Sequence, residues 1–400
     1  PPRRSAVSTM PFAPMSMSRG KGSPRAAWTG GLACLLFAAF CGAQPAPASV
    51  EGPDVAPATG PARADEPAPL PPAEPLRPAR PPGPPIALVL PLESPDYARA
   101  AEAVRDGFLA AAAAAGATDR VRVIPHGANG VLAAFEEAQW DGARVVVGPL
   151  VRDDLRALAT SENPLPVTIA LNQLDDTAAL PPRVYTFALA IESDARTIAR
   201  RMRDERSENV AVIVGDTPLM RRFAQAFVAE WILAGGNPPL SYPLVATQDG
   251  LRAMRRDLGR TTIDAIVMAV DGPDAALVKT YAPRVTTWAS AQVYQRPDAS
   301  AMRDLDDVRY VDVSWLVAPD SASFAKLPRP EFASPALDRL YALGLDAFRV
   351  AQAFVTAPPD RLSFDGATGH VELSDARQIA REGRLATFRS GAIVPLDAPR

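Results

Sequence analysis

The best candidates for a binding site are residues that lie shortly after three short apolar runs. The apolar runs span residues 86–90, 145–147 and 167–171. The candidate residues are Ser94, Tyr97, Gly148, Leu150, Asn172 and Gln173. Glycine lets a backbone approach a ligand, a helix that starts after Pro149 points its first amides outward, and asparagine both donates and accepts. These residues therefore predict a ligand cleft. The alternative is that Gly148-Pro149 is a strand-to-helix turn and Asn172 a loop cap.

Residues suited to catalysis are scarce. The chain has two histidines, His126 and His370, far apart in sequence, and neither has a recognisable metal-ligand or triad neighbourhood. The GxSxG, P-loop, GxGxxG and HExxH patterns do not occur in the sequence. Acid pairs such as Asp153-Asp154 are adjacent in the chain, and adjacent residues on a helix do not face each other. We therefore expect no catalytic residue, no metal site and no cofactor.

Short apolar runs alternate with segments of helical periodicity, which is typical of an α/β protein with a mostly parallel sheet. Strands are expected at residues 86–90, 121–124, 145–147, 167–171, 210–214, 240–245, 263–269, 285–288 and 308–313, and residues 184–187 are expected to be a crossing point between the lobes. Parallel strands with helical crossovers place their carboxyl ends along one sheet edge, where open α/β folds bind ligands. The candidate residues should therefore meet there. Residues 362–373, with the turn signal Asp365-Gly366, predict a hairpin or a tight loop instead.

The N-terminal part of the sequence differs in composition from the rest. Residues 1–43 combine basic residues with a short apolar run, which predicts a secretory signal too short to span a bilayer. Residues 44–85 hold 15 of the 43 prolines and predict a disordered linker. Cys41 is the candidate for lipidation, although Phe40 before it is large, and Cys34 has the small Ala33 before it. Ordinary cleavage after residue 43, which gives a soluble periplasmic product, remains the alternative.

The charge pattern excludes one class of partner. The formal net charge is -3, and the arginines are interleaved with acidic residues rather than grouped on one face. Nucleic-acid binding depends on a concentrated basic surface. We therefore expect no nucleic-acid partner, and contact with a membrane only through an N-terminal lipid.

Four stretches resemble a known family. They are IALVLPL (86–92), VVVGPLVRDDLRAL (145–158), TIALNQ (168–173) and FDGATGHVEL (364–373), the last followed by Arg381. In this order they look like the LppC/LpoA-type activators of penicillin-binding proteins. The resemblance covers residues 86–400 and implies a type I periplasmic-binding-protein fold, a two-lobed Venus flytrap.

The resemblance also implies a function and a cellular location. It implies a non-catalytic periplasmic protein, anchored to the outer membrane, that stimulates peptidoglycan synthesis by contact with a class A penicillin-binding protein. The alternative is a receptor for a small molecule of the amino-acid type, with its ligand in the cleft. The first lobe is expected at residues 86–186 and 291–354, and the second at residues 187–290 and 355–400.

Overall fold

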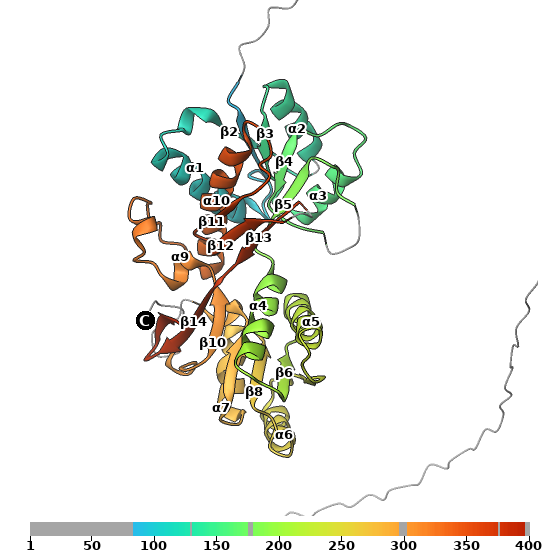
Figure 1. The fold of residues 1–400 in the computed structure, drawn as a ribbon, viewed down its shortest axis with the longest axis vertical. Coiled ribbons are helices and arrows are strands. Elements are labelled where there is room, and N and C mark those ends of the chain that lie inside the picture. Colours follow the sequence, from blue (N-terminus) through green and yellow to red (C-terminus); the bar gives the residue numbers. More distant parts are fainter. Residues whose placement is uncertain (1–82, 129, 175–178, 296–301, 375–376, 397–400) are drawn as a thin grey trace, which may run out of the picture. The chain divides into compact units, whose positions relative to one another are not determined.

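The computed structural model describes residues 83–128, 130–174, 179–295, 302–374 and 377–396. The chain divides into two units, Pro1–Pro75 and Leu76–Arg400, and every described residue lies in the second. The predicted signal, its two cysteines and nearly all of the predicted linker therefore lie outside the described residues. The described part forms two α/β lobes, each built on its own sheet (Figure 1).

The first lobe is built on an eight-stranded sheet in the order β11-β12-β13-β5-β4-β3-β1-β2. Its strands are β1 (Ile86–Leu90), β2 (Val121–Pro125), β3 (Val145–Val147), β4 (Val167–Ala170), β5 (Val184–Phe187), β11 (Ser363–Asp365), β12 (His370–Leu373) and β13 (Gln378–Glu382). The strands β1 to β5 pair in parallel, with Ile86 opposite both Val121 and Val145. Every residue of β1, β3 and β4 is buried, as expected for parallel strands covered on both faces.

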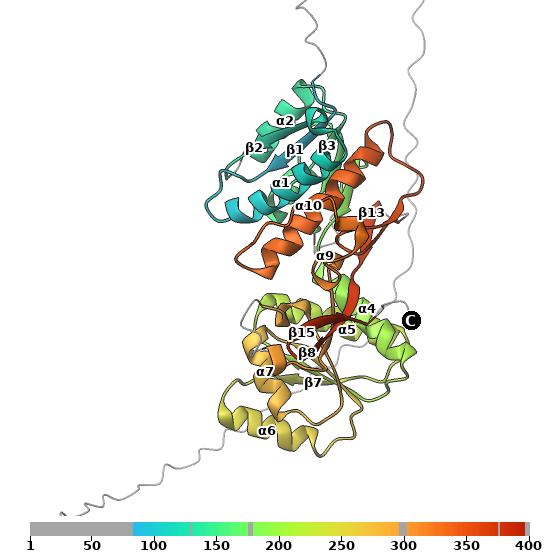
Figure 2. The ribbon, with the colours of Figure 1, turned by 90° about the vertical axis from the view of Figure 1, so that its left-hand side faces the viewer.

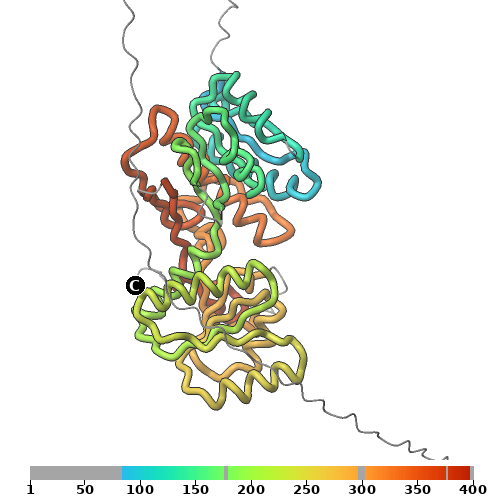
Figure 3. Tube along the Cα trace, turned by 90° about the vertical axis from the view of Figure 1, so that its right-hand side faces the viewer, coloured from blue at the N-terminus to red at the C-terminus, as the bar shows by residue number. Residues whose placement is uncertain are grey.

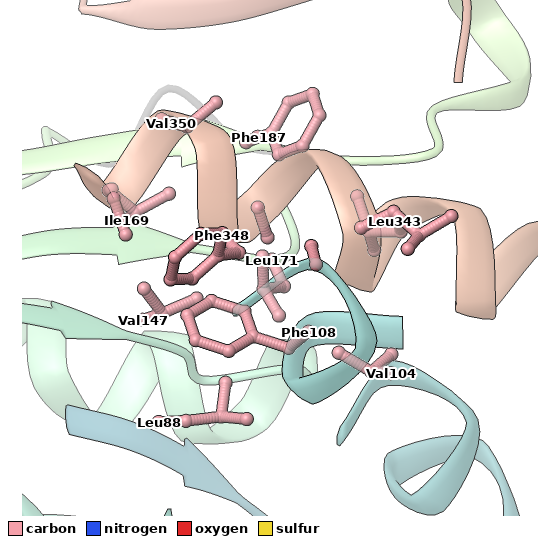
Figure 4. Close-up of a cluster of buried hydrophobic side chains, with 14 of the residues drawn as sticks. Leu88, Val104, Phe108, Val147, Ile169, Leu171, Phe187, Leu343, Phe348 and Val350 are labelled. Atoms are coloured by element: carbon pink, nitrogen blue, oxygen red, sulfur yellow. The ribbon is translucent and has the colours of Figure 1, made fainter. Parts of the chain in front are cut away.

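Four helices cover the two faces of this sheet. They are α1 (Ala98–Ala114), α2 (Val131–Trp140), α3 (Arg152–Ala159) and α10 (Pro335–Phe354). Alternate residues of β1 enter different cores: Leu88 packs with α1 and α10, and Val89 packs with α2 and α3. Figure 4 shows the first of these cores, where the rings of Phe108 and Phe348 meet edge to face with centroids 5.4 Å apart.

Helices α1 and α10 lie side by side at very close range (Figure 2). A Cβ atom added to Gly344 would lie 2.1 Å from the Val104 carbonyl oxygen, and one added to Gly107 would lie 2.1 Å from the Tyr341 carbonyl oxygen. The two backbones approach this closely because each helix has glycine at the contact.

The second lobe has a seven-stranded sheet in the order β15-β14-β10-β9-β8-β6-β7. Its strands are β6 (Val210–Val214), β7 (Leu240–Pro243), β8 (Ala265–Ala269), β9 (Thr286–Ala289), β10 (Arg309–Asp312), β14 (Arg384–Arg389) and β15 (Ala392–Pro395). One face packs against α4 (Ile191–Asp204) and α5 (Pro218–Leu233), and the other against α6 (Gln248–Leu258) and α7 (Gly272–Tyr281). The predicted fold class, two lobes with parallel sheets flanked by helices, is confirmed.

Three segments carry the chain between the lobes (Figure 3). They are residues 188–190, residues 313–334, which include α9 (Ser314–Val317), and the single residue Gly383 between β13 and β14. We call these three segments the hinge. A Cβ atom on Gly383 would lie 2.6 Å from Val311 Cγ1 and 3.0 Å from the Asp312 carbonyl oxygen, so only glycine fits at this crossing without displacement.

The lobe boundaries differ from those expected. Strand β10 and the short helix Ala291–Val293 join the second lobe, where Val293 and Tyr310 are buried, rather than the first. Strands β11 to β13 join the first lobe rather than the second, because β13 extends the sheet beside β5 and buries Ile379 in the first core. The predicted hairpin within residues 362–373 is present as the antiparallel pair β11 and β12.

Candidate functional site

Asn172 joins the loops that follow β3 and β4. Its side-chain Nδ2 donates to the Leu150 carbonyl at 2.9 Å, and its Oδ1 accepts from the Gln173 N–H at 2.9 Å. The Leu171 N–H donates to the Pro149 carbonyl at 2.9 Å and ties the same two loops. The side-chain amide of Asn172 is therefore already used on each side to hold the cleft edge together.

Gly148 serves packing within the first lobe. Its φ of +122° is in the region that favours glycine, and an added Cβ would lie 2.1 Å from the Val89 carbonyl oxygen. Its N–H donates to the Ile169 carbonyl at 2.9 Å. The missing side chain makes room for strand β1.

Ser94 and Tyr97 lie in the loop that leads from β1 into α1. Ser94 is buried, and its carbonyl accepts from the N–H groups of Tyr97 and Ala98. Tyr97 is the residue before the first turn of α1 and is 44% exposed. Neither residue lines the cleft pocket described next, and neither does Gly148.

A pocket of about 200 Å³ lies where the two lobes meet at the cleft edge, and it gathers three of the six predicted residues, Leu150, Asn172 and Gln173. The remaining walls come from residues of both lobes: Arg152, Leu171, Ala188, Leu189, Ala190, Ile191, Leu219, Arg222, Leu340 and Leu343. Arg222 also donates to Glu192 Oε1 at 2.7 Å. Ligand pockets for small molecules usually measure about 300–1,000 Å³. The pocket is therefore smaller than a usual site for a small ligand.

A larger pocket of about 470 Å³ lies at the hinge and was not predicted. Both lobes contribute to it: Thr197, Ser314, Ser321, Ser323, Phe324, Asp365, Gly366, Gly369, His370, Glu382, Gly383, Arg384 and Leu385. It collects hydroxyl groups and charges of both signs. No local sequence pattern predicts this pocket, because its lining comes from five separate stretches.

His370 is part of a chain of polar contacts on the β11–β12 hairpin. Its Nδ1 lies 2.8 Å from Asp365 Oδ1, and its Nε2 lies 3.3 Å from Ser363 Oγ. The order Ser, His, Asp is that of a hydrolase triad, but the Asp365 side chain is 92% exposed. The amides of the adjoining loop are also engaged: Gly366 donates to the Gly369 carbonyl, and Ala367 and Thr368 donate to Asp346. They cannot form an oxyanion hole, so these contacts stabilise the hairpin.

His126, the other histidine, is buried in the loop after β2. Its Nδ1 lies 3.0 Å from the Gly127 carbonyl oxygen, and its Nε2 lies 3.9 Å from Asp154 Oδ2. Burial raises the pKa of the Asp154 carboxyl, the charge interaction with His126 opposes this rise, and Asp153 adds to it. The described residues contain no group of three or more side chains that could hold a metal ion.

Two buried ion pairs cross the hinge, and sequence reasoning missed both. Arg339 of α10 binds the carboxylate of Asp312 at the end of β10 through two hydrogen bonds of 2.8 Å. Arg381 of β13 donates to Asp194 Oδ2 of α4 at 2.8 Å. The partners of the second pair are 187 positions apart, so nothing in the sequence links them.

Two α/β lobes joined by three segments, with the carboxyl ends of parallel strands at the cleft edge, define a type I periplasmic-binding-protein-like domain. The chain matches the family model described as "LppC putative lipoprotein" over residues 81–239 and 245–391. It belongs to the LppC family, as the four sequence stretches predicted.

Relatives with curated names support the same family. The penicillin-binding protein activator LpoA of Escherichia coli (strain K12) is 26% identical over 309 residues, which are 66% of this chain and 45% of the relative. The activator LpoA of Edwardsiella piscicida is 27% identical over 308 residues, covering 66% and 44% of the two chains. The chain thus spans about half the length of the curated relatives it matches.

Solved structures share the fold. One described as a "putative branched-chain amino acid ABC transporter" from Chromobacterium violaceum is 30% identical, with a TM-score of 0.68, and covers 76% of this chain and 99% of that one. The LpoA C-domain from Haemophilus influenzae, described as a regulator of PBP1A, is 22% identical with a TM-score of 0.66, covering 78% and 99%. No helix among the described residues has both the length and the apolar character needed to cross a membrane.

Proposed function

We propose that this protein is a non-catalytic activator of a class A penicillin-binding protein and regulates peptidoglycan synthesis by protein contact. Membership of the LppC family supports this proposal, as do the names of the LpoA relatives. The structural likeness to the LpoA C-domain of Haemophilus influenzae, a regulator of PBP1A, adds the same fold.

The small, internally bonded cleft is the observation that favours an activator over a receptor. A receptor needs free polar groups that converge on an open volume. Here the pocket measures about 200 Å³, and Asn172 already bonds to Leu150 and Gln173. The activator would therefore act through its outer surface, with the cleft edge serving as structure.

Binding and synthesis assays with the purified full chain test the proposal. The partner is a class A synthase from the same bacterium, and the readouts are complex formation and the rate of glycan polymerisation from lipid II. We expect binding and a faster rate, and the same behaviour from Asn172→Ala, because that change leaves the outer surface intact. A synthase that neither binds the chain nor changes its rate would contradict the proposal.

The location that goes with this role is the periplasm, with a lipid anchor in the outer membrane. The family description as lipoproteins supports the anchor. The candidate lipid acceptor is Cys41, with Cys34 as the alternative, and both lie outside the described residues. Mass spectrometry of the mature N-terminus separates a diacylated cysteine from a chain that was cleaved after residue 43.

A small-molecule receptor is the second candidate function. The Chromobacterium violaceum structure, described as an amino acid transporter protein, favours it, since it shares 30% identity. The hinge pocket of about 470 Å³ falls in the size range of ligand sites. A thermal shift with leucine or other free amino acids tests this function: loss of the shift in Asn172→Ala would assign the ligand to the cleft, and loss in Arg384→Ala would assign it to the hinge pocket.

A further inference from the structure

The buried charges at the hinge link residues of different lobes. Arg339 belongs to the first lobe, and its partner Asp312 ends a strand of the second. The same guanidinium donates from Nη2 to the carbonyl of Ala291, also in the second lobe, at 2.8 Å. One arginine of the first lobe therefore holds two separate segments of the second.

The other pair crosses the hinge in the same sense, with its arginine in the first lobe and its aspartate in the second. Arg381 lies two residues before the Gly383 crossing, and Asp194 lies in the first turn of α4, just past the crossing at residues 188–190. All four charged residues are less than 9% exposed. The two pairs also interact electrostatically. Burial raises the pKa of Asp194 and Arg381 opposes this rise, while Asp312 of the other pair raises this pKa further and Arg339 lowers it.

The Arg339–Asp312 contact restricts rotation as well as separation, whereas Arg381 holds Asp194 through a single hydrogen bond. A guanidinium that binds a carboxylate through two parallel hydrogen bonds fixes the relative orientation of the two groups, not only their distance. Rotation of one lobe about the hinge would pull Arg339 from Asp312 and Ala291, and Arg381 from Asp194. Each of these charges would then lose its partner, which is strongly unfavourable for a charge that stays buried.

The backbone around the two ion pairs is closely packed. Gly383 lies against Val311 and the carbonyl of Asp312, and the Trp315 N–H in the second crossing donates to the Ala367 carbonyl of the first lobe at 2.9 Å. We propose that the Arg339–Asp312 and Arg381–Asp194 pairs lock the two lobes at one angle, so that the domain is a rigid scaffold and not a flytrap that closes on a ligand. This inference goes beyond the proposed function, because it holds whatever partner the chain binds.

Distance measurements between the lobes test the lock. The full chain, with Cys34 and Cys41 changed to serine, receives spin labels at cysteines that replace Glu102 on α1 and Arg255 on α6, both exposed. Pulsed dipolar spectroscopy then gives the distribution of distances between the lobes. We expect one narrow distribution, unchanged when a free amino acid such as leucine is added. Two populations, or a shift on adding leucine, would overturn the proposal.

Variants that remove the charges in pairs test which residues hold the lobes. Arg339→Met with Asp312→Asn, and Arg381→Met with Asp194→Asn, avoid an unpaired buried charge, which makes such replacements tolerable. Asparagine at position 312 can still accept from the Val313 N–H, as the aspartate does at 2.8 Å. A variant that carries all four substitutions should show a broader distribution of distances between the lobes, with an unchanged helix content.

The matched control removes an exposed pair with the same chemistry. Arg156→Met with Asp153→Asn breaks an ion pair on α3 within the first lobe, and the distribution should stay narrow. If the combined hinge variant does not fold, Arg339→Lys keeps the charge, loses the two-bond fork and should broaden the distribution less. A hinge variant that folds and stays as narrow as the wild type would show that these pairs are not the lock.

Discussion

Replacing Asp346 by alanine should destabilise the β11–β12 hairpin, because its side chain holds the hairpin loop to α10. Asp346 lies on α10, and its buried carboxylate accepts three hydrogen bonds from the loop. The Ala367 N–H donates at 2.9 Å, the Thr368 N–H at 2.7 Å and the Thr368 hydroxyl at 2.6 Å. Gly366 is required beside it, since an added Cβ would lie 2.4 Å from Asp346 Oδ2.

The magnitude follows from the number of donors that lose their partner. A buried donor left without an acceptor costs about 1–3 kcal/mol, so three donors would cost about 3–9 kcal/mol. Burial raises the pKa of Asp346, which means that the folded protein bears a cost for the ionised carboxylate that alanine removes. The lower end of the range is therefore expected, a loss of about 3 kcal/mol in the free energy of unfolding.

Urea denaturation measures this loss, and hydrogen exchange at β11 and β12 locates it. Thr368→Val is the matched control, because it removes only the hydroxyl donor and should cost about 1 kcal/mol. In the double variant the two losses should not add, since both remove the same bond. If Asp346→Ala cost no more than Thr368→Val, the carboxylate would not be what fastens the loop to α10.

Three further predictions concern the first lobe. Burial raises the pKa of Tyr341 to about 12, while the pKa of an unfolded tyrosine is about 10. Between these values only the unfolded state loses the proton, so the free energy of unfolding is constant below about pH 10 and falls toward pH 12. Tyr341→Phe should reduce this fall in urea midpoints measured from pH 9 to 12, and an equal fall in both proteins would contradict it. Gly344→Ala should lower the melting temperature. Overpacking against the Val104 carbonyl costs about 1–3 kcal/mol, which outweighs the gain of about 1 kcal/mol in helix propensity. An unchanged or higher melting temperature would mean that α1 and α10 can move apart. Asn172→Ala should cost about 1 kcal/mol and speed amide exchange at Gln173, and unaltered exchange would show that the loops hold without this side chain.

Local patterns in the sequence predicted most of the first half of the fold. The run at residues 86–90 became strand β1 with the expected bounds, because continuous burial on both faces leaves a continuous apolar signature. The hairpin was predicted by Asp365-Gly366, a local turn signal. Which sheet each late strand joins was not predictable, since β13 meets β5 and β14 meets β10 only through contacts distant in sequence.

The candidate site was predicted less well than the fold. Sequence placed Leu150, Asn172 and Gln173 together correctly, because parallel strands end at a common edge. The sequence does not reveal which group lies against the Cα of Gly148. In the structure that group is the Val89 carbonyl and not a ligand. The two ion pairs at the hinge could not be predicted from the sequence. Arg339 and Arg381 are two among 39 arginines, and their partners come close only in the folded chain.

The single-residue crossing at Gly383 has a consequence for how the chain is made. Strand β13 completes the first sheet beside β5, and β14, one residue later, completes the second beside β10. A chain that emerges from its N-terminus therefore has all inner strands of the first sheet only at residue 382, and those of the second only at residue 389. Both lobes depend on the same short stretch, so their final folding steps should occur together, after residues 378–389 have emerged.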